Sequence, residues 1–397
     1  MWERPPAKLS LQCYAGARSP SVRAVTAMPI ADYFSPDYSS ARERFCTAAQ
    51  RAGARLGRYV LPERLGPRGE SLSIDVARLG PEDASDALVV LSGTHGVEGF
   101  AGAGCQVGFL TDRLYEALPP TACALLVHAL NPYGFAWLRR VNEDNVDLNR
   151  NFIDFSRPPS SAAYEPLHPA LVPSDWEGET RQRADAVLNQ YIATHGMAGF
   201  QQALTAGQYT RPEGLFYGGT APTWSARTLG QLLREQLPTK MQRVAVLDLH
   251  TGLGPTAYGE PAVLPTARGD LARARAWYGC EVRSLVAEES LALTGEKSVS
   301  AELSGTLASG FQAALPQQEI TYLGLEFGTR PVQEVLTALR ADHWVHARAP
   351  DDAVRSAAAQ HLMRAAFYCD MPAWQAAVYG RTADFVFRTC RALTRAA

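Results

Sequence analysis

A histidine and a glutamate three positions apart could together bind a metal ion. His95 and Glu98 follow the apolar run 88–92 and a glycine, Gly93. A buried strand ending there would place an imidazole and a carboxylate at the carboxyl edge of a sheet, where open α/β proteins bind ligands. The plainer alternative is a loop histidine beside a glutamate that favours the positive end of a helix dipole.

The same pattern recurs at His250, which follows the apolar run 244–249 and precedes the glycine-containing turn 251–255. Two histidines and one glutamate make the ligand set of an open catalytic zinc site, whose fourth position is left to water. A structural zinc would normally take four ligands with several cysteines, and no cysteine cluster accompanies these motifs. Asp248 could accept an imidazole N–H from a ligand, or be an ordinary strand-end aspartate.

Asparagine and arginine are dense between these two motifs. Asn131 opens an Asn-Pro-Tyr-Gly stretch, Arg139 and Arg140 follow it, and residues 147–152 read Asp-Leu-Asn-Arg-Asn-Phe. Arginine grips carboxylates through two N–H groups, and asparagine adds a donor and an acceptor. The cluster therefore suits the anionic end of a substrate, with a solvated polar loop as the alternative.

A lone carboxylate, Glu326, ends the apolar run 320–325. A charge in that position is costly unless it has a partner or a task. Beside a zinc-bound water, it would be a general base that takes the water's proton and returns it to the leaving nitrogen. The alternative is an ion pair with an arginine such as Arg330.

Apolar runs alternate with helical stretches along the chain. This alternation predicts an α/β fold with a mixed, largely parallel sheet flanked by helices on both faces. A further helix should run to residue 48, capped by Ser39 or Ser40. The predicted strands are 71–77, 87–92, 123–129, 244–249 and 320–326, and the other predicted helices are 97–110, 184–195, 226–236, 269–277 and 353–368.

Residues 28–397 are predicted to form a single domain, and residues 1–27 to be disordered or upstream of a true start at Met28. Residues 156–240 read as a lid-like insertion, because long loops inside a compact domain are usually functional or mobile. Its aromatic loop 207–219 contains Tyr217, which could close over substrate and supply a hydroxyl. A packed structural hairpin is the alternative for that loop.

Charge and cysteine content narrow the class of protein. With 38 basic and 40 acidic residues, the chain has no general attraction to nucleic acid or to an anionic membrane. No run approaches the roughly 18 apolar residues that a membrane span needs. Seven cysteines, an odd number without a CxxC pair, are typical of a cytoplasmic protein. The sequence gives no indication of the oligomeric state.

The order of these motifs resembles the zinc carboxypeptidase superfamily. The likeness covers residues 88–329 and is greatest to a bacterial branch described as a domain of unknown function, DUF2817; the aspartoacylase and succinylglutamate desuccinylase branch is also similar. The resemblance implies a zinc ion, a catalytic base, a pair that binds the terminal carboxylate of the substrate, and an arginine that polarises the scissile carbonyl. By position these are His95, Glu98 and His250 for zinc, Glu326 as base, Asn149 and Arg150 for the carboxylate, and Arg140 for the carbonyl, with Arg139 as second choice.

Three functions remain open on the sequence. The first is hydrolysis of a peptide-like amide next to a free carboxylate, and the second is deacylation of an N-acyl amino acid by the same zinc machinery. The substrate is then a small peptide or an acylated amino acid. The third is a non-catalytic protein that binds zinc or a small molecule, which would have no need of Glu326.

Overall fold

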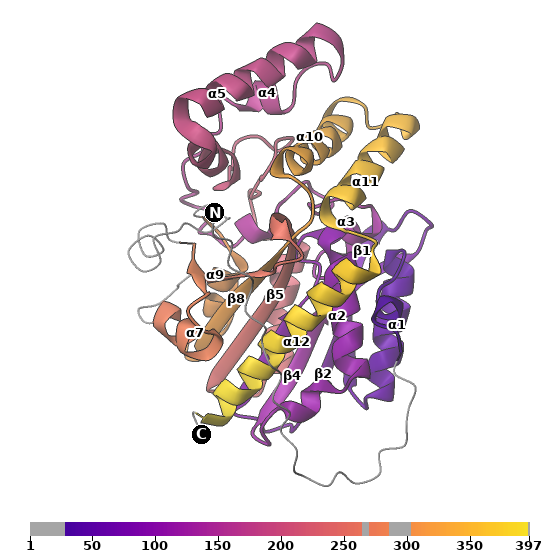
Figure 1. Cartoon of the computed structure of the whole chain (residues 1–397), viewed down its shortest axis with the longest axis vertical. Helices are drawn as coiled ribbons and strands as arrows, with labels where there is room; N and C mark the ends of the chain where they lie inside the picture. The colour runs from indigo at the N-terminus through magenta and orange to yellow at the C-terminus, as the bar shows by residue number, and fades with distance from the viewer. Residues whose placement is uncertain (1–27, 264–269, 286–302, 396–397) are drawn as a thin grey trace, which may run out of the picture.

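One mixed sheet forms the centre of the molecule (Figure 1). The computed structural model describes residues 28–263, 270–285 and 303–395, so the prediction for residues 1–27 lies outside the described residues. Within these ranges the sheet has eight strands in the order β1-β2-β4-β3-β5-β8-β6-β7. The strands are β1 (Arg55–Leu65), β2 (Ser71–Leu79), β3 (Asp86–Leu91), β4 (Ala122–His128), β5 (Arg243–Thr256), β6 (Glu260–Val263), β7 (Arg283–Ser284) and β8 (Glu319–Gly328).

The four central strands, β4, β3, β5 and β8, are parallel to one another. Antiparallel pairs flank them, since β2 runs against β4 on one side and β6 runs against β8 on the other. Parallel neighbours bring their carboxyl ends to one edge of the sheet, so the residues that follow β3, β5 and β8 are close in space. The predicted α/β fold with a mixed, largely parallel sheet is confirmed.

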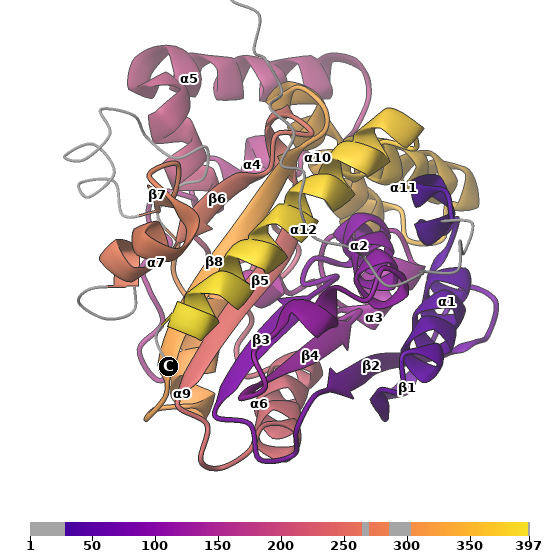
Figure 2. The ribbon, with the colours of Figure 1, turned by 60° about the horizontal axis from the view of Figure 1, so that its bottom comes forward.

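Helices cover both faces of the sheet (Figure 2). Successive side chains of a strand point to opposite faces, and on β3 Leu88 and Val90 join one core while Val89 and Leu91 join the other. The first core is closed by α1 (Tyr38–Arg51), α2 (Gly99–Thr111), α7 (Asp270–Tyr278) and α12 (Pro372–Arg395), and the second by α6 (Trp224–Gln236) and α9 (Leu307–Ala314).

A further group of helices lies beyond the end of the sheet, at the top of Figure 1. It consists of α4 (His168–Leu171), α5 (Gly178–Thr205), α10 (Val332–Arg348) and α11 (Ala353–Phe367). The short elements are α3 (Pro132–Ala136), η1 (Ile30–Tyr33), η2 (Gly96–Glu98), η3 (Leu114–Ala117) and η4 (Leu148–Arg150). None of the helices in the described ranges is both long and apolar enough to cross a membrane.

The predicted strands and helices all occur, but the start of α1 differs. The helix begins at Tyr38, and its cap is Asp37, whose side chain accepts the backbone N–H of Ser40. The prediction of Ser39 or Ser40 as the cap is therefore wrong, because the aspartate is a better-placed acceptor for the first free N–H groups. The predicted helix 184–195 is the middle of the longer α5, which is bent at Gly196.

Close backbone packing fixes the segment between β3 and α2. A side chain at Gly96 would lie 2.1 Å from the backbone of Gly134, so only glycine permits this contact. The backbone N–H groups of Gly96 and Val97 donate to the carbonyls of Arg140 and Arg139, at 3.1 and 2.9 Å. These backbone hydrogen bonds alone join the His95-to-Glu98 turn to the segment that contains Arg139 and Arg140.

Candidate metal and substrate site

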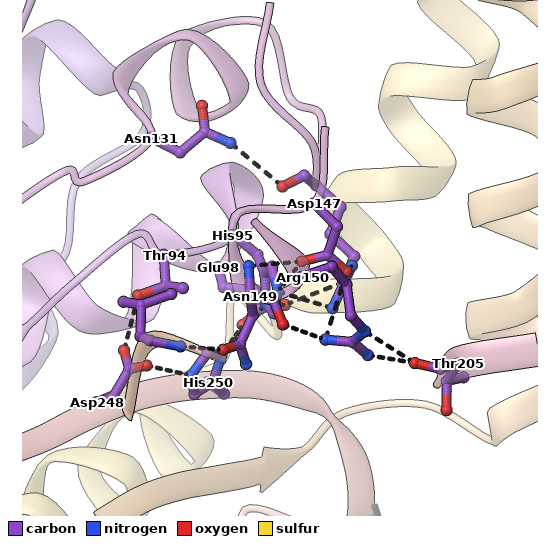
Figure 3. A network of polar contacts seen from close by, with 12 residues as sticks. Thr94, His95, Glu98, Asn131, Asp147, Asn149, Arg150, Thr205, Asp248 and His250 are labelled. Atoms are coloured by element: carbon purple, nitrogen blue, oxygen red, sulfur yellow. Dashed lines mark hydrogen bonds and ion pairs between the residues drawn. The ribbon is translucent and has the colours of Figure 1, made fainter. Parts of the chain in front are cut away.

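Three side chains from two strand ends converge in a buried cage (Figure 3). His95 Nδ1 lies 2.9 Å from Glu98 Oε1, and His250 Nδ1 lies 3.2 Å from both Glu98 Oε2 and His95 Nδ1. Ligands bound tetrahedrally to zinc at 2.0–2.2 Å would be separated by about 3.4 Å. The cage therefore fits a zinc ion after shifts of a few tenths of an ångström.

Two buried carboxylates orient the histidines from behind. Asp248 Oδ2 lies 2.6 Å from His250 Nε2, and Asp147 Oδ1 lies 3.1 Å from His95 Nε2. A carboxylate can only accept, so each Nε2 carries a proton and each Nδ1 faces the cage, where it can serve as a ligand atom. Asp248 is held in turn by the hydroxyls of Thr94 at 2.8 Å and Tyr322 at 2.5 Å. The orienting contact expected of Asp248 is present.

Electrostatics favour a charged cage. Burial opposes ionisation of Glu98, but the two histidines lower its pKa to about 2. Burial also opposes the charge on Asp248, and His250 outweighs it, so the pKa of Asp248 is lowered. The pKa of His250 is raised well above its usual value, because Asp248 and Glu98 outweigh burial. The carboxylate of Glu98 contacts both cage imidazoles, and a dication bound there would replace the proton that the raised pKa keeps on His250.

Glu326 lies beside this cage at the end of β8, directly across the strand pair from His250. Its Oε1 accepts the backbone N–H of Leu253 at 3.2 Å, and the side chain lines the same cavity as the three cage residues. Burial and the nearby Glu98 raise the pKa of Glu326 to about 8. Arg330, the ion-pair partner considered from the sequence, donates instead to the carbonyl of Ala365.

The two adjacent arginines have different surroundings. Arg139 is buried and forms a two-pronged ion pair with Asp342 of α10, at 2.9 and 3.0 Å, and does not line the cavity. Arg140 lines the cavity and pairs with Asp147. Its Nη2 lies 2.8 Å from His95 Nε2, and these two donors cannot bond when that nitrogen carries the proton. Ligation through His95 Nδ1 therefore requires a small turn of the Arg140 guanidinium.

Asn149 and Arg150 lie in η4 and also line the cavity. The guanidinium of Arg150 donates to the carbonyl of Thr205 at 2.9 and 2.6 Å and to that of Asn149 at 2.8 Å. The side-chain oxygen of Asn149 accepts the backbone N–H of Leu307 at 2.9 Å. Both side chains are thus held by backbone groups of α5 and α9.

A cavity of about 420 Å³ joins these groups. Its charged floor consists of His95, Glu98, Arg140, Arg150, His250 and Glu326. The same cavity is lined by an apolar wall made by side chains of α5 and α10: Ile192, Met197, Phe200, Leu204, Val332, Val335, Leu336 and Leu339. The volume is in the range of sites that enclose a small organic ligand.

The aromatic loop contributes a different residue from the predicted one. Tyr217 is buried and does not line the cavity, whereas its neighbour Phe216 does. The ring of Phe216 lies over both arginines of the floor, 5.0 Å from the guanidinium of Arg140 and 5.6 Å from that of Arg150. The structure therefore does not bring Tyr217 to the site, because the loop is closed by a bridge between Gln208 and Tyr217.

Phe216 holds its position at a conformational cost. Its φ of +54° is in the left-handed region, which is unfavourable for a bulky residue. The backbone N–H of Gln208 donates to the Phe216 carbonyl at 3.1 Å, and the backbone N–H of Asp147 donates to the Tyr217 carbonyl at 2.8 Å. Such strain persists only where the surroundings impose it, and it is concentrated at functional sites.

Sequence reasoning missed four residues of the site: Thr94, Asp147, Phe216 and Tyr322. A signal for Asp147 was present, because a metal-bound histidine usually donates its second ring N–H to a carboxylate and Asp147 is the one carboxylate of the Asp-Leu-Asn-Arg string. Phe216, Thr94 and Tyr322 carry no such signal, since their contacts depend on how distant segments fold together.

The structure is similar to that of the metallo-carboxypeptidase from Burkholderia cenocepacia, with a TM-score of 0.36, 15% identity, and coverage of 88% of this chain and 71% of that one. For carboxypeptidase A from Helicoverpa armigera the TM-score is 0.42 and the identity 12%, with coverage of 83% of this chain and 73% of that one. For succinylglutamate desuccinylase from Chromobacterium violaceum the TM-score is 0.33 and the identity 13%, with coverage of 80% of this chain and 75% of that one. No curated protein matches the sequence. The model of the family described as protein of unknown function (DUF2817) matches residues 34–381, and the chain belongs to that family.

Proposed function

We propose that this protein is a zinc-dependent hydrolase that cleaves a peptide-like amide next to a free carboxylate. The observation that carries the proposal is the cage of His95, Glu98 and His250 with Glu326 beside it in one cavity. Three ligands leave one tetrahedral position for water or substrate, as in catalytic rather than structural zinc sites. The backing carboxylates fix the ring nitrogens that face the ion.

Glu326 is the proposed base. A bound zinc ion would lower the pKa of its water to near neutrality and polarise a carbonyl oxygen. With an ion in the cage, whose charge would counter the raised pKa of Glu326, this carboxylate would accept a proton from water and deliver it to the nitrogen of the leaving amine. The bond to the Leu253 N–H holds one carboxylate oxygen and leaves the other for the water.

The arginines bind the charges of the substrate. Arg140, once turned from His95, donates to the oxygen on which negative charge develops. Asn149 and Arg150 hold the free carboxylate that lies next to the scissile amide. Residues 28–397 would act as one domain, in which the insertion 156–240 supplies α5 and Phe216 as a cover over the floor.

A second candidate is deacylation of N-acyl amino acids by the same residues, and the apolar wall favours it. The wall provides space for an acyl group without offering charged partners to it. A silent binding protein is a weaker candidate, because Glu326 would then occupy a costly position without a task.

The test is hydrolysis of a panel of dipeptides and N-acyl amino acids by metal-depleted protein before and after addition of one equivalent of Zn²⁺. Zinc-restored activity on substrates with a free carboxylate, and much lower activity on their carboxamides, is the expected result. Activity that survives metal depletion would exclude the proposed mechanism.

A further inference from the structure

Eight apolar side chains of α5 and α10 form the wall, and part of this wall is exposed. Met197 of α5 is 41% exposed and Val332 of α10 is 40% exposed, and both line the cavity. Exposed apolar side chains that gather on one concave surface mark a binding site more often than chance placement. The exposed part of the wall offers apolar surface to a bound molecule.

The bend in α5 contributes to this surface. Gly196 has a φ of +74° and interrupts the helix, so that the segment after it, with Phe200 and Leu204, changes direction. Those two side chains and Met197 line the cavity together with Leu336 of α10.

The wall offers few hydrogen-bonding groups. Apart from Gln201, Thr205 and Gln333, the residues of α5 and α10 that line the cavity are apolar. Each further peptide unit of a substrate would bring an N–H and a carbonyl, which cost free energy when buried without partners. A hydrocarbon chain brings no such groups, so the wall favours an acyl chain over additional amino-acid residues.

The charged floor fixes the orientation of such a substrate. Arg140 and Arg150 line the same cavity as the wall, with the ring of Phe216 against both guanidinium groups. A molecule with a carboxylate at one end and a hydrocarbon chain at the other matches both surfaces, and its amide would then lie near Glu326 and the cage.

We propose that the substrate is an N-acyl amino acid with a long apolar acyl chain, bound along α5 and α10. The inference rests on the proposed hydrolase function and specifies its substrate class. In the reaction, the water oxygen bonds to the acyl carbon, the carbon–nitrogen bond breaks, and the nitrogen gains a proton. The products are a fatty carboxylate and a free amino acid.

The first test compares N-acetyl-, N-hexanoyl- and N-decanoyl-alanine as substrates. Burial of each methylene should raise kcat/KM about fourfold, the equivalent of about 0.8 kcal/mol, until the wall is covered. Dipeptides of alanine with one large apolar residue are measured alongside. A rate that does not depend on chain length, or dipeptides that exceed the decanoyl substrate, would overturn the acyl-chain proposal.

The second test uses wall variants with matched controls. Met197→Gln and Val332→Gln should lower kcat/KM for N-decanoyl-alanine several-fold and affect N-acetyl-alanine much less. Val187→Gln on α5 and Val354→Gln on α11 replace valines that are 49% and 81% exposed and do not line the cavity. These controls should behave as the parent; equal losses in controls and wall variants would contradict the assignment.

Binding separates this inference from the proposed function. The Glu326→Gln variant is titrated with N-decanoyl- and N-acetyl-alanine by calorimetry. Tighter binding of the decanoyl compound by the variant, with no hydrolysis by the parent, would support the acyl-binding wall while overturning the hydrolase. Hydrolysis by the parent with equal binding of both compounds would support the hydrolase and overturn the acyl-binding wall.

Discussion

The charged floor and the apolar wall of the cavity are built differently. The floor comes from strand ends and from the turns attached to them, where backbone pairing sets the distances. The wall comes from helices that lie beyond the sheet, and it depends on a bend at Gly196 and on side chains at the surface. The difference teaches that the sheet sets the spacing of the proposed metal and base residues, whereas the apolar lining depends on helices outside the sheet.

The largest expected effect is at Glu326, on the floor. Glu326→Gln keeps the shape and the Leu253 contact and removes the base, so turnover should fall by roughly 10² to 10⁴. Zinc content should persist, because Glu326 is not a ligand in this account. Single-turnover kinetics and metal analysis of one sample test both halves. Loss of zinc would make Glu326 a ligand, and normal turnover would place the base elsewhere.

Next in size is Arg150. Arg150→Met should raise KM for substrates with a free carboxylate, since removing one partner of a desolvated ion pair costs about 2–5 kcal/mol. Their carboxamides, which lack the charge, should be affected little. Steady-state kinetics on the matched pairs measure the difference. An equal effect on both would mean that Arg150 serves only to hold the Thr205 carbonyl.

A smaller effect is expected behind the cage. Asp248→Asn removes the charge that orients His250 and should weaken zinc affinity about 10- to 100-fold. Tyr322→Phe, which removes one bond to Asp248, should have a weaker effect in the same direction. Competition with a chromophoric chelator gives both affinities. Unchanged affinity in Asp248→Asn would show that His250 needs no support.

The smallest effect should be at Phe216, where floor and wall meet. Phe216→Gly relieves the positive φ but removes a buried ring, so the free energy of unfolding should fall by about 3–5 kcal/mol and binding is measured on protein shown to be folded. Loss of the ring over the two arginines should weaken substrate binding by about 0.5–2 kcal/mol. Phe216→Leu separates apolar bulk from the aromatic ring. If it binds substrate as the parent does, the ring itself has no role.

The sequence predicted the elements that form the floor better than those that form the wall. Apolar runs that end in His250 and Glu326 predict strands and place polar groups at one edge of the sheet, and this prediction is confirmed for the strands. Helix α10 was not predicted, because its buried face includes Arg340, Asp342 and His343, which interrupt the apolar pattern. Strand β1 was missed because it is an edge strand with mostly exposed residues.

Contacts between segments distant in the sequence could not be predicted from the sequence. The roles proposed for Arg140, Asn149 and Arg150 remain predictions, although all three line the cavity. Phe216 entered the site in place of Tyr217 because the pairing of Gln208 with the end of the loop decides which ring faces inward. A one-residue shift of this kind cannot be seen in a loop without periodic pattern.

The most direct test of the central claim is the zinc content of histidine variants. The parent should hold about one zinc per chain, because three preorganised ligands with one open position form a tight site. His95→Ala and His250→Ala should lose it, while His195→Ala, at an exposed position on α5, should keep it. Circular dichroism confirms that each variant is folded. Parental zinc content in folded His95→Ala and His250→Ala would contradict the metal cage.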